Sequence, residues 1–264
     1  MLVLDNVAVT YANGTQALAS TSLTIHGGQF VVLLGRSGAG KSTLLRSMNG
    51  LVSPTAGEIR AEGFGALSDP GVLRRHRRAT GMIFQQHHLI GKMSALSNVL
   101  TGRLGYHSTL RSLLPLPRAD RLLALACLER VDLLDKALVR VDQLSGGQQQ
   151  RVGIARAIAQ EPRLMLADEP VASLDPATAE AVLRDLREIA TRDRITTVVS
   201  LHQLDLARRF ADRVIGLRQG RVVADVPGSE LTDAVAAAIY GGEGACPGDA
   251  AGSERKTRDT RDAA

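Results

Sequence analysis

One stretch of the chain decides the fold, and it reads Phe30-Val31-Val32-Leu33-Leu34-Gly35-Arg36-Ser37-Gly38-Ala39-Gly40-Lys41-Ser42. Five apolar residues in succession are typical of a strand that is buried on both faces. The next eight residues have the spacing of a phosphate-binding loop, and a segment of helical composition follows them until Gly50. The order of strand, glycine-rich loop and helix predicts an α/β fold with this strand inside a parallel sheet.

The loop is predicted to bind the phosphates of a nucleotide. Its glycines allow a tight turn whose backbone N–H groups point at phosphate oxygens, and the helix that follows adds its positive N-terminal dipole. Lys41 would reach the β- and γ-phosphates, and Ser42 would offer its hydroxyl to Mg²⁺. A glycine-rich turn without a ligand is the alternative, but the flanking strand and helix are what phosphate binding requires. The predicted ATP-binding residues of this loop are Gly35, Arg36, Ser37, Gly38, Ala39, Gly40, Lys41, Ser42 and Thr43.

A second apolar run, residues 164–167, ends in Asp168 and Glu169. Next to a phosphate-binding loop, Asp168 would hold Mg²⁺ directly or through water. Glu169 would act as the general base on the attacking water. Without that loop, the same run would be equally consistent with two structural acids.

The order of segments predicts a core with two flanking parts. Alternating strands and helices at residues 164–167, 176–191 and 196–201 favour a parallel sheet, which a hairpin over residues 214–226 would close. Antiparallel strands are expected at residues 2–9 and 18–25, with a turn between them at Asn13-Gly14.

An inserted helical subdomain is expected at about residues 89–150, within a domain that covers residues 1–243. Its second half is rich in leucine, and Pro115 and Pro117 interrupt it. Residues 244–264 are rich in Gly, Ala, Ser, Asp and Arg and nearly lack large apolar side chains, so we expect a disordered tail.

Composition narrows the class of protein. Hydrophobic residues make up 44% of the chain and aromatic residues only 3%, so the core must be built from Leu, Val, Ile and Ala. The two cysteines, Cys127 and Cys246, are far apart, which fits a reducing compartment rather than a disulfide framework. We see no signal peptide and no apolar run near the roughly 18 residues of a membrane span, so a membrane role is expected only through a partner.

The formal net charge is +5, and part of the excess lies in Arg74, Arg75, Arg77 and Arg78. Nucleic acid, an anionic surface or phosphate ligands are the partners that a basic chain suggests. No aromatic residues interleave with these arginines to stack on bases, so nucleic-acid binding is disfavoured and a solvated helix face is preferred.

The octet Leu144-Ser-Gly-Gly-Gln-Gln-Gln-Arg151 places Ser145 and two glycines at the start of a helix. A serine N-cap without a ligand is the alternative explanation of this pattern. A helix N-terminus is also an anion site, and one phosphate group does not need two such sites from one chain. We therefore expect this site to serve an ATP that is held by a second copy of the chain. The octet resembles the signature motif of ABC ATPases, and residues 1–240 carry that family's motifs in its order and spacing. The signature residues expected to act in trans are Ser145, Gly146, Gly147 and Gln148.

The resemblance implies roles for four further residues. Tyr11 resembles the aromatic residue that stacks on adenine. Gln85 resembles the glutamine that touches Mg²⁺ and the attacking water, although Gln86 is adjacent and only the family spacing decides between them. Asp175 resembles the loop residue that crosses the dimer interface, and His202 resembles the histidine that contacts the γ-phosphate. His87 and His88 are expected to be loop residues and not metal ligands.

Three further segments resemble the phosphonate-import branch of that family, namely residues 102–106, 167–176 and 201–207. This resemblance implies an ATP-hydrolysing subunit of an importer on the cytoplasmic face of a bacterial inner membrane. Its partners would be a second copy, a transmembrane permease and, indirectly, a periplasmic solute-binding protein that delivers phosphonate. The permease would dock near residues 85–96.

Three alternatives stay open at this point. The cargo could be another small polar solute or oxyanion, such as an amino acid or a phosphate ester. The chain could act on DNA or ribosomes, although it lacks the second cassette or coiled-coil insertion usual there. It could also be a nucleotide switch that does not hydrolyse ATP, against which the intact Glu169 and His202 argue.

Overall fold

A computed structural model describes residues 1–85, 88–112 and 114–241. In this part of the chain a larger sheet has the strand order β10-β9-β3-β8-β7-β6, and β9, β3, β8, β7 and β6 run parallel. β10 closes the sheet as an antiparallel hairpin with β9. The strands are β3 (Phe30–Leu34), β6 (Thr80–Ile83), β7 (Leu164–Ala167), β8 (Thr196–Ser200), β9 (Arg213–Arg218) and β10 (Arg221–Pro227). The parallel sheet and its closing hairpin were both predicted.

A smaller antiparallel sheet has the order β2-β1-β4-β5 among the described residues. Its strands are β1 (Leu2–Thr10), β2 (Gln16–Ile25), β4 (Ala56–Ala61) and β5 (Gly65–Ala66). The predicted turn between β1 and β2 is present, with Gly14 at φ +83°. The sequence pattern missed β4 and β5: β4 contains a single β-branched residue, Ile59, among Ala, Gly, Glu and Arg, and β5 has only two residues.

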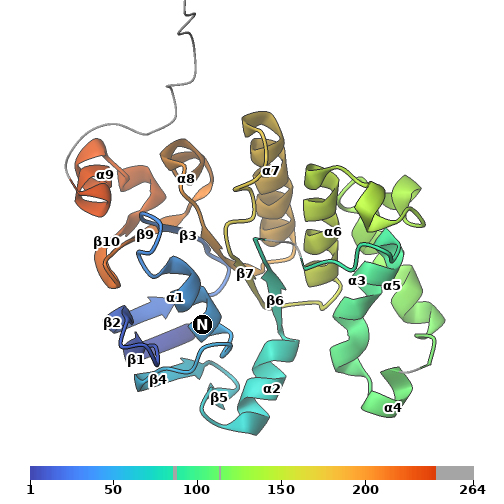
Figure 1. The fold of residues 1–264 in the computed structure, drawn as a ribbon, viewed down its shortest axis with the longest axis horizontal. Coiled ribbons are helices and arrows are strands. Elements are labelled where there is room, and N and C mark those ends of the chain that lie inside the picture. The colour runs from blue at the N-terminus through green and yellow to red at the C-terminus, as the bar shows by residue number, and fades with distance from the viewer. Residues whose placement is uncertain (86–87, 113, 242–264) are drawn as a thin grey trace, which may run out of the picture.

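The helices divide into two groups (Figure 1). The group around the larger sheet contains α1 (Lys41–Met48), α2 (Pro70–Arg78), α7 (Pro176–Arg192), α8 (Leu204–Phe210), a 3-10 turn η4 (Gly228–Glu230) and α9 (Asp233–Tyr240). The group beyond β6 and β7 contains α3 (Ala95–Leu100), η1 (Thr101–Tyr106), α4 (Thr109–Ser112), α5 (Arg118–Glu129), η2 (Leu134–Lys136), η3 (Val141–Gln143) and α6 (Gly146–Ile158).

The second group lies where the sequence predicts an inserted helical subdomain, and Pro117, which was expected to interrupt the helical stretch, is the N-cap of α5. Its boundaries at residues 89 and 150 stay a prediction. The predicted tail, residues 244–264, lies outside the described residues. No helix in the described ranges is long and apolar enough to cross a membrane.

Strand β3 lies between two hydrophobic cores. Phe30, Val32 and Leu34 face one core, which also contains residues of α5, α6 and α7. Val31 and Leu33 face the other core, which contains residues of α1, β1 and β2. Because successive side chains point to opposite faces of a strand, a continuous apolar run supplies both cores at once. The loop that follows β3 is therefore anchored on both sides.

Candidate active site

At two positions of the loop after β3, the backbone conformation and the close neighbours leave room only for glycine. Gly35 has φ +152°, and a Cβ built there would lie 2.3 Å from the carbonyl oxygen of Leu217. Gly40, the N-cap of α1, has φ +104°, and its Cβ would lie 2.6 Å from the carbonyl oxygen of Ala17. These positions keep the loop closely packed while it turns into the N-terminus of α1. A glycine-rich loop that ends at a helix N-terminus in this way is the arrangement that the predicted phosphate site requires.

Lys41 begins α1, and its side chain is 3% exposed. Its Nζ donates to the carbonyl oxygens of Gly35 (2.7 Å) and Arg36 (3.2 Å). Burial lowers the pKa of this ammonium, and the negative charges of Glu169 and Asp168 oppose that shift. The Lys41 side chain therefore lies folded over the loop, where the oxygens of a bound anion would replace the two carbonyl groups.

Asp168, at the carboxyl end of β7, is held by three side chains from two elements, α1 and β8. Its Oδ1 accepts hydrogen bonds from Ser42 Oγ (2.7 Å) and Ser200 Oγ (3.1 Å). Arg46, one helical turn after Ser42, places a guanidinium nitrogen 3.6 Å from Asp168 Oδ2. The Asp168 carboxylate is 2% exposed, so its negative charge is fixed at one place beside the loop.

The donors that meet at Asp168 suit a hard cation, since they are a carboxylate and a hydroxyl. Within residues 1–85, 88–112 and 114–241, no group of three or more His, Cys, Asp or Glu side chains could hold a metal ion. Asp168 and Ser42 supply one carboxylate and one hydroxyl, so a cation beside them would take further ligands from water and from substrate phosphates. Mg²⁺ binds in this way, through one or two carboxylates together with phosphate oxygens.

Glu169 and His202 form the other half of the site. Glu169 Oε1 lies 2.5 Å from His202 Nε2 and 3.9 Å from Lys41 Nζ. His202 Nδ1 lies 3.5 Å from Lys41 Nζ, so a neutral ring with its proton on Nε2 satisfies both neighbours: Nε2 donates to Glu169 and Nδ1 faces the ammonium. Glu169 has φ +47°, a conformation that L-residues rarely adopt.

The sequence reasoning missed Ser200, a fully buried residue at the end of β8. Its Oγ accepts from the backbone N–H of Glu169 (2.8 Å) and donates to Asp168. Ser200 therefore links both acids. One feature of the sequence could have identified Ser200 as a site residue. It lies two residues before His202, at the end of β8, which pairs with β7.

Tyr11 and Gln85 lie nearer the edge of this site. The Tyr11 hydroxyl is 3.1 Å from Thr43 Oγ1, and the side chain is 40% exposed, so its ring is available at the side of α1. Gln85 is exposed and comes two residues after β6, the strand that pairs with β7. The neighbouring Gln86 and His87 lie outside the described residues.

The predicted signature residues lie in the other half of the chain. Ser145 caps α6: its Oγ accepts from the Gln148 N–H (3.3 Å), and its own N–H donates to Gln148 Oε1 (3.1 Å). Figure 1 places α6 on the opposite side of β6 and β7 from α1. Ser145 and Gly146 are exposed. The chain thus presents a second helix N-terminus to its surroundings.

Asp175, predicted for the dimer interface, caps α7 by accepting from the Thr178 N–H (3.0 Å). Hydrogen bonds from the Thr178 side chain and backbone hold the pKa of this carboxyl below its usual range. Gly147 packs closely against Thr178: a Cβ built on Gly147 would lie 2.6 Å from Thr178 Cγ2. The signature segment and the Asp175 loop are therefore neighbours in one chain.

Comparison with known protein families matches residues 18–172 to the family described as ABC transporter. A phosphonates import ATP-binding protein, PhnC 3 of Nostoc sp. (strain PCC 7120 / SAG 25.82 / UTEX 2576), is 59% identical over 241 residues, which cover 91% of this chain and 92% of that protein. A phosphite import ATP-binding protein, PxtA of Stutzerimonas stutzeri, is 62% identical over 242 residues, which cover 92% of this chain and 88% of that protein.

Solved structures give the same assignment. The bacterial ABC transporter cassette MJ0796, in a dimeric structure, is similar with a TM-score of 0.76 and 37% identity, over 86% of this chain and 98% of that one. A second dimeric structure of MJ0796, in a post-hydrolysis state bound to ADP and Pi, matches with a TM-score of 0.75 over the same shares.

Proposed function

This chain belongs to the ABC transporter family, and on that premise we propose that it is the ATP-hydrolysing subunit of an importer that carries phosphonates across a bacterial inner membrane. The observation that carries the proposal is the meeting of Lys41, Glu169 and His202 beside the phosphate loop. A chain with this arrangement has the groups that ATP hydrolysis requires. Relatives named as phosphonates import ATP-binding proteins support the choice of cargo.

The residues of the loop bind the ATP phosphates in this proposal. The N–H groups of residues 35–43 surround the β- and γ-phosphates, and Lys41 neutralises part of their charge. Ser42, Asp168 and Gln85 would hold Mg²⁺, which would supply positive charge to offset the negative charge of the β- and γ-phosphates. The Tyr11 ring stacks on the adenine base.

Glu169 is the general base. Its carboxylate accepts a proton from water while the water oxygen attacks the γ-phosphorus, and the bond to the bridging oxygen of ADP breaks. His202 orients this carboxylate through Nε2 and contacts the γ-phosphate. The hydrogen bond between Ser200 and the Glu169 backbone keeps the base in place, which supports a fixed geometry for proton transfer.

Two copies of the chain complete each other's ATP site. Ser145, Gly146, Gly147 and Gln148 of one copy contact the γ-phosphate held by the other, and Asp175 crosses the interface between them. The exposed N-terminus of α6 supports this assignment, as does the likeness to a cassette that was solved as a dimer. ATP binding then closes the pair, and hydrolysis opens it.

The further partners follow from the same proposal. A permease dimer spans the membrane, the cassettes lie on its cytoplasmic face, and a periplasmic binding protein delivers the solute outside. Phosphite is a second candidate cargo, since a relative named as a phosphite import protein is 62% identical to this chain.

Uptake in cells of the native host separates these cargoes. Each strain would carry wild-type protein, Glu169→Gln, or the exposed control Glu188→Gln as its only copy. We expect uptake of labelled methylphosphonate with the wild type and the control, and no uptake with Glu169→Gln. Uptake of phosphite alone would favour the second candidate. Uptake of neither anion, from a chain that hydrolyses ATP when purified, would show that the cargo is wrong and the enzyme assignment right.

A further inference from the structure

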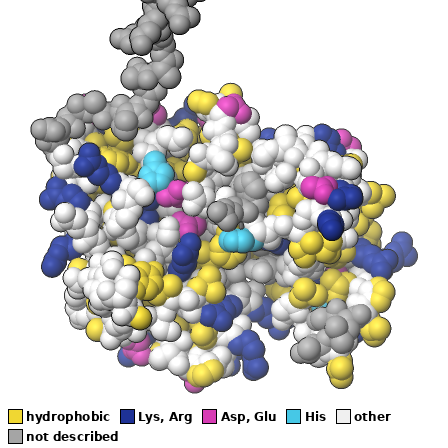
Figure 2. Space-filling view, in the orientation of Figure 1, with side chains coloured by type: hydrophobic (Ala, Val, Ile, Leu, Met, Phe, Trp, Pro, Cys, Tyr) yellow, Lys and Arg dark blue, Asp and Glu magenta, His cyan; other side chains and the backbone are white. Residues whose placement is uncertain are grey.

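The outer end of the helical group exposes three leucine side chains. Leu110 of α4 is 79% exposed, Leu114 is 60% exposed, and Leu122 of α5 is 55% exposed. Figure 2 shows hydrophobic side chains over the position of α4, at the lower right of the molecule, with Lys and Arg side chains beside them. Exposed apolar residues that are scattered singly need no explanation, but three of them in one short segment do.

Basic side chains accompany these leucines. Arg118, Arg121 and Leu122 are spaced as i, i+3 and i+4 in α5, so they share one face of this helix, and all three are exposed. In the described ranges, no carboxylate forms an ion pair with Arg118 or Arg121. The positive charge beside the leucines is therefore not neutralised by these parts of the chain.

The segment that carries the leucines is tied together at its two ends. His107 Nε2 lies 2.6 Å from Asp120 Oδ2, and these residues are 13 positions apart. Asp120 is 6% exposed and also accepts from Arg103 Nε (2.9 Å). The acid nearest to the exposed arginines in the sequence thus points inward. Figure 1 shows α4 at the lower end of the helical group, away from both sheets.

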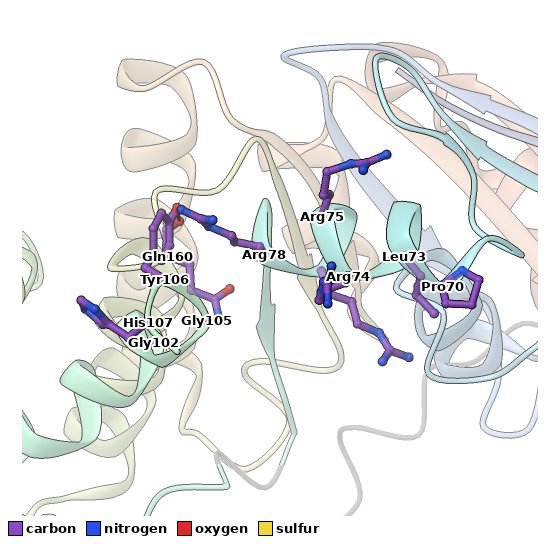
Figure 3. Close-up of a pocket in the computed structure, with 11 residues that line it drawn as sticks. Pro70, Leu73, Arg74, Arg75, Arg78, Gly102, Gly105, Tyr106, His107 and Gln160 are labelled. Carbon is purple, nitrogen blue, oxygen red and sulfur yellow. Dashed lines mark hydrogen bonds between the residues drawn. The ribbon is translucent and has the colours of Figure 1, made fainter. Parts of the chain in front are cut away.

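The start of this segment is also held from the side of α2. An arginine-lined cavity of about 830 Å³ lies between α2 and η1, with Tyr106 in its wall (Figure 3). The Tyr106 hydroxyl donates to the carbonyl oxygen of Gln160 (2.7 Å), and Arg78 Cζ lies 3.9 Å from the centroid of its ring. The exposed leucines therefore follow a fixed support.

This surface lies away from the proposed contacts between two copies. Gly102 of η1 packs on the C-terminal part of α6, since a Cβ on it would lie 2.4 Å from the carbonyl oxygen of Arg156. Ser145 caps the opposite end of α6, whose 13 residues span roughly 20 Å. A second copy bound at Ser145 would therefore leave α4 and the start of α5 open.

We propose that the surface formed by Leu110, Leu114, Leu122, Arg118 and Arg121 binds an anionic lipid bilayer. The leucines enter the boundary between headgroups and acyl chains, and the guanidinium groups bind the lipid phosphates. A bilayer places negative charge directly above an apolar layer, which matches both kinds of side chain on this surface. The contact goes beyond the proposed function, because it requires neither the permease nor a particular cargo.

The first test measures co-sedimentation of the purified full chain with phosphatidylcholine vesicles that contain or lack phosphatidylglycerol. We expect the wild type to bind the anionic vesicles more tightly. Arg118→Gln/Arg121→Gln should weaken that binding by roughly 25-fold, since each basic residue near an anionic surface contributes about fivefold. The matched control Arg192→Gln/Arg194→Gln makes the same charge change at two exposed residues and should have little effect.

The leucines are tested in the same assay. Leu110→Ser/Leu114→Ser should weaken binding to anionic vesicles by about tenfold or more, because apolar surface no longer leaves water. The loss should persist at high salt, where the arginines contribute little. Leu134→Ser/Leu138→Ser removes two exposed leucines elsewhere and is the matched control.

Basal ATPase activity in these samples reports folding, and none of the substituted residues belongs to the ATP site. Lost vesicle binding with retained ATPase activity supports the proposal. A wild type that does not bind anionic vesicles, or equal losses in surface and control variants, overturns it. Leucine-dependent self-association, or leucine-dependent binding of the membrane-spanning subunit without vesicle binding, would assign the surface to a protein and also overturn it. Vesicle binding by a chain without ATPase activity would remove the proposed function alone.

Insertion can be observed directly, because the chain contains no tryptophan. Leu114→Trp introduces a single indole at the proposed surface, and Leu138→Trp introduces one at the control position. With anionic vesicles, we expect the emission of Leu114→Trp to shift to shorter wavelength and to be quenched by brominated acyl chains. The emission of Leu138→Trp should not change. An unchanged spectrum of vesicle-bound Leu114→Trp would show that this surface does not enter the bilayer.

Discussion

Glu169 Oε1 and His202 Nε2 lie 2.5 Å apart, although β7 and β8 deliver these residues from positions 33 apart in the sequence. The other ring nitrogen of His202 faces Lys41. The imidazole therefore lies between a carboxylate and an ammonium. In this position it can hold the carboxylate while an anion binds at the ammonium.

Replacing Glu169 by Gln removes the proposed base and keeps the shape of the side chain. We expect kcat for ATP hydrolysis to fall by about 10²- to 10⁴-fold, which is the usual contribution of a general base. ATP should then hold the variant as a dimer on a size-exclusion column, while the wild type returns to monomer. Glu188→Gln, on the exposed face of α7, is the control. Identical elution of Glu169→Gln and wild type in ATP would contradict the base assignment.

A Ser200 variant tests whether the Ser200 hydroxyl positions Glu169 and Asp168. Changing it to Ala leaves the Glu169 N–H without its acceptor and Asp168 without one donor, at a cost of about 1–3 kcal/mol for a buried polar group. We expect a lower free energy of unfolding by that amount and a kcat lower by roughly tenfold. Ser200→Thr keeps the hydroxyl and should restore most of kcat. If threonine restores stability but not kcat, the hydroxyl is only structural.

Mixed dimers test whether Ser145 acts on the partner's ATP. Lys41→Ala and Ser145→Arg chains, each also carrying Glu169→Gln, should form few dimers with ATP when alone. Mixed together they form one intact site, with Lys41 from one chain and Ser145 from the other, so ATP-dependent association should rise. A mixture of Lys41→Ala with Ser42→Ala has no intact site and should not associate. Equal behaviour of the two mixtures would place Ser145 in its own chain's site.

Cys127 should be unreactive in the folded protein. Burial raises the pKa of its thiol to about 11, so at pH 8 the thiolate fraction is roughly one in a thousand. We expect iodoacetamide to leave Cys127 unmodified at pH 8 in a Cys246→Ser variant and to modify it fully after unfolding in urea. Because the folded pKa is above the unfolded value of 9.0, the thiol favours the folded state below pH 9. That contribution is lost as the pH rises toward about 11. Rapid labelling of native protein at pH 8 would show that this residue is not buried.

The sequence was most informative where one local pattern determines both conformation and chemistry. The apolar run of β3, the glycines and Lys41 predicted the strand, the loop and the helix α1, and the pattern of residues 214–226 predicted the closing hairpin. These features depend on neighbours in the chain, which a single sequence contains. The roles of the site residues stay predictions until the variants above are measured.

Two arrangements that join distant segments were not predicted. The link from Ser200 to both acids requires β7 and β8 to be adjacent, and the arginine-lined cavity requires α2 to lie opposite η1. Residues 102–106 were noted only for their resemblance, and nothing in the sequence showed that the hydroxyl of Tyr106 would donate to the carbonyl oxygen of Gln160 after α6. Such contacts arise from tertiary packing, which propensity and periodicity do not encode.

The alternating side chains of β3 also affect the cooperativity of thermal unfolding. Because Phe30 and Val32 belong to one core and Val31 and Leu33 to the other, neither core can lose its order while this strand keeps its place. The two halves should therefore unfold in one cooperative step, visible as a single calorimetric transition with equal calorimetric and van't Hoff enthalpies. The phosphate loop leaves this shared strand, so it should persist until global unfolding rather than open by local fluctuation.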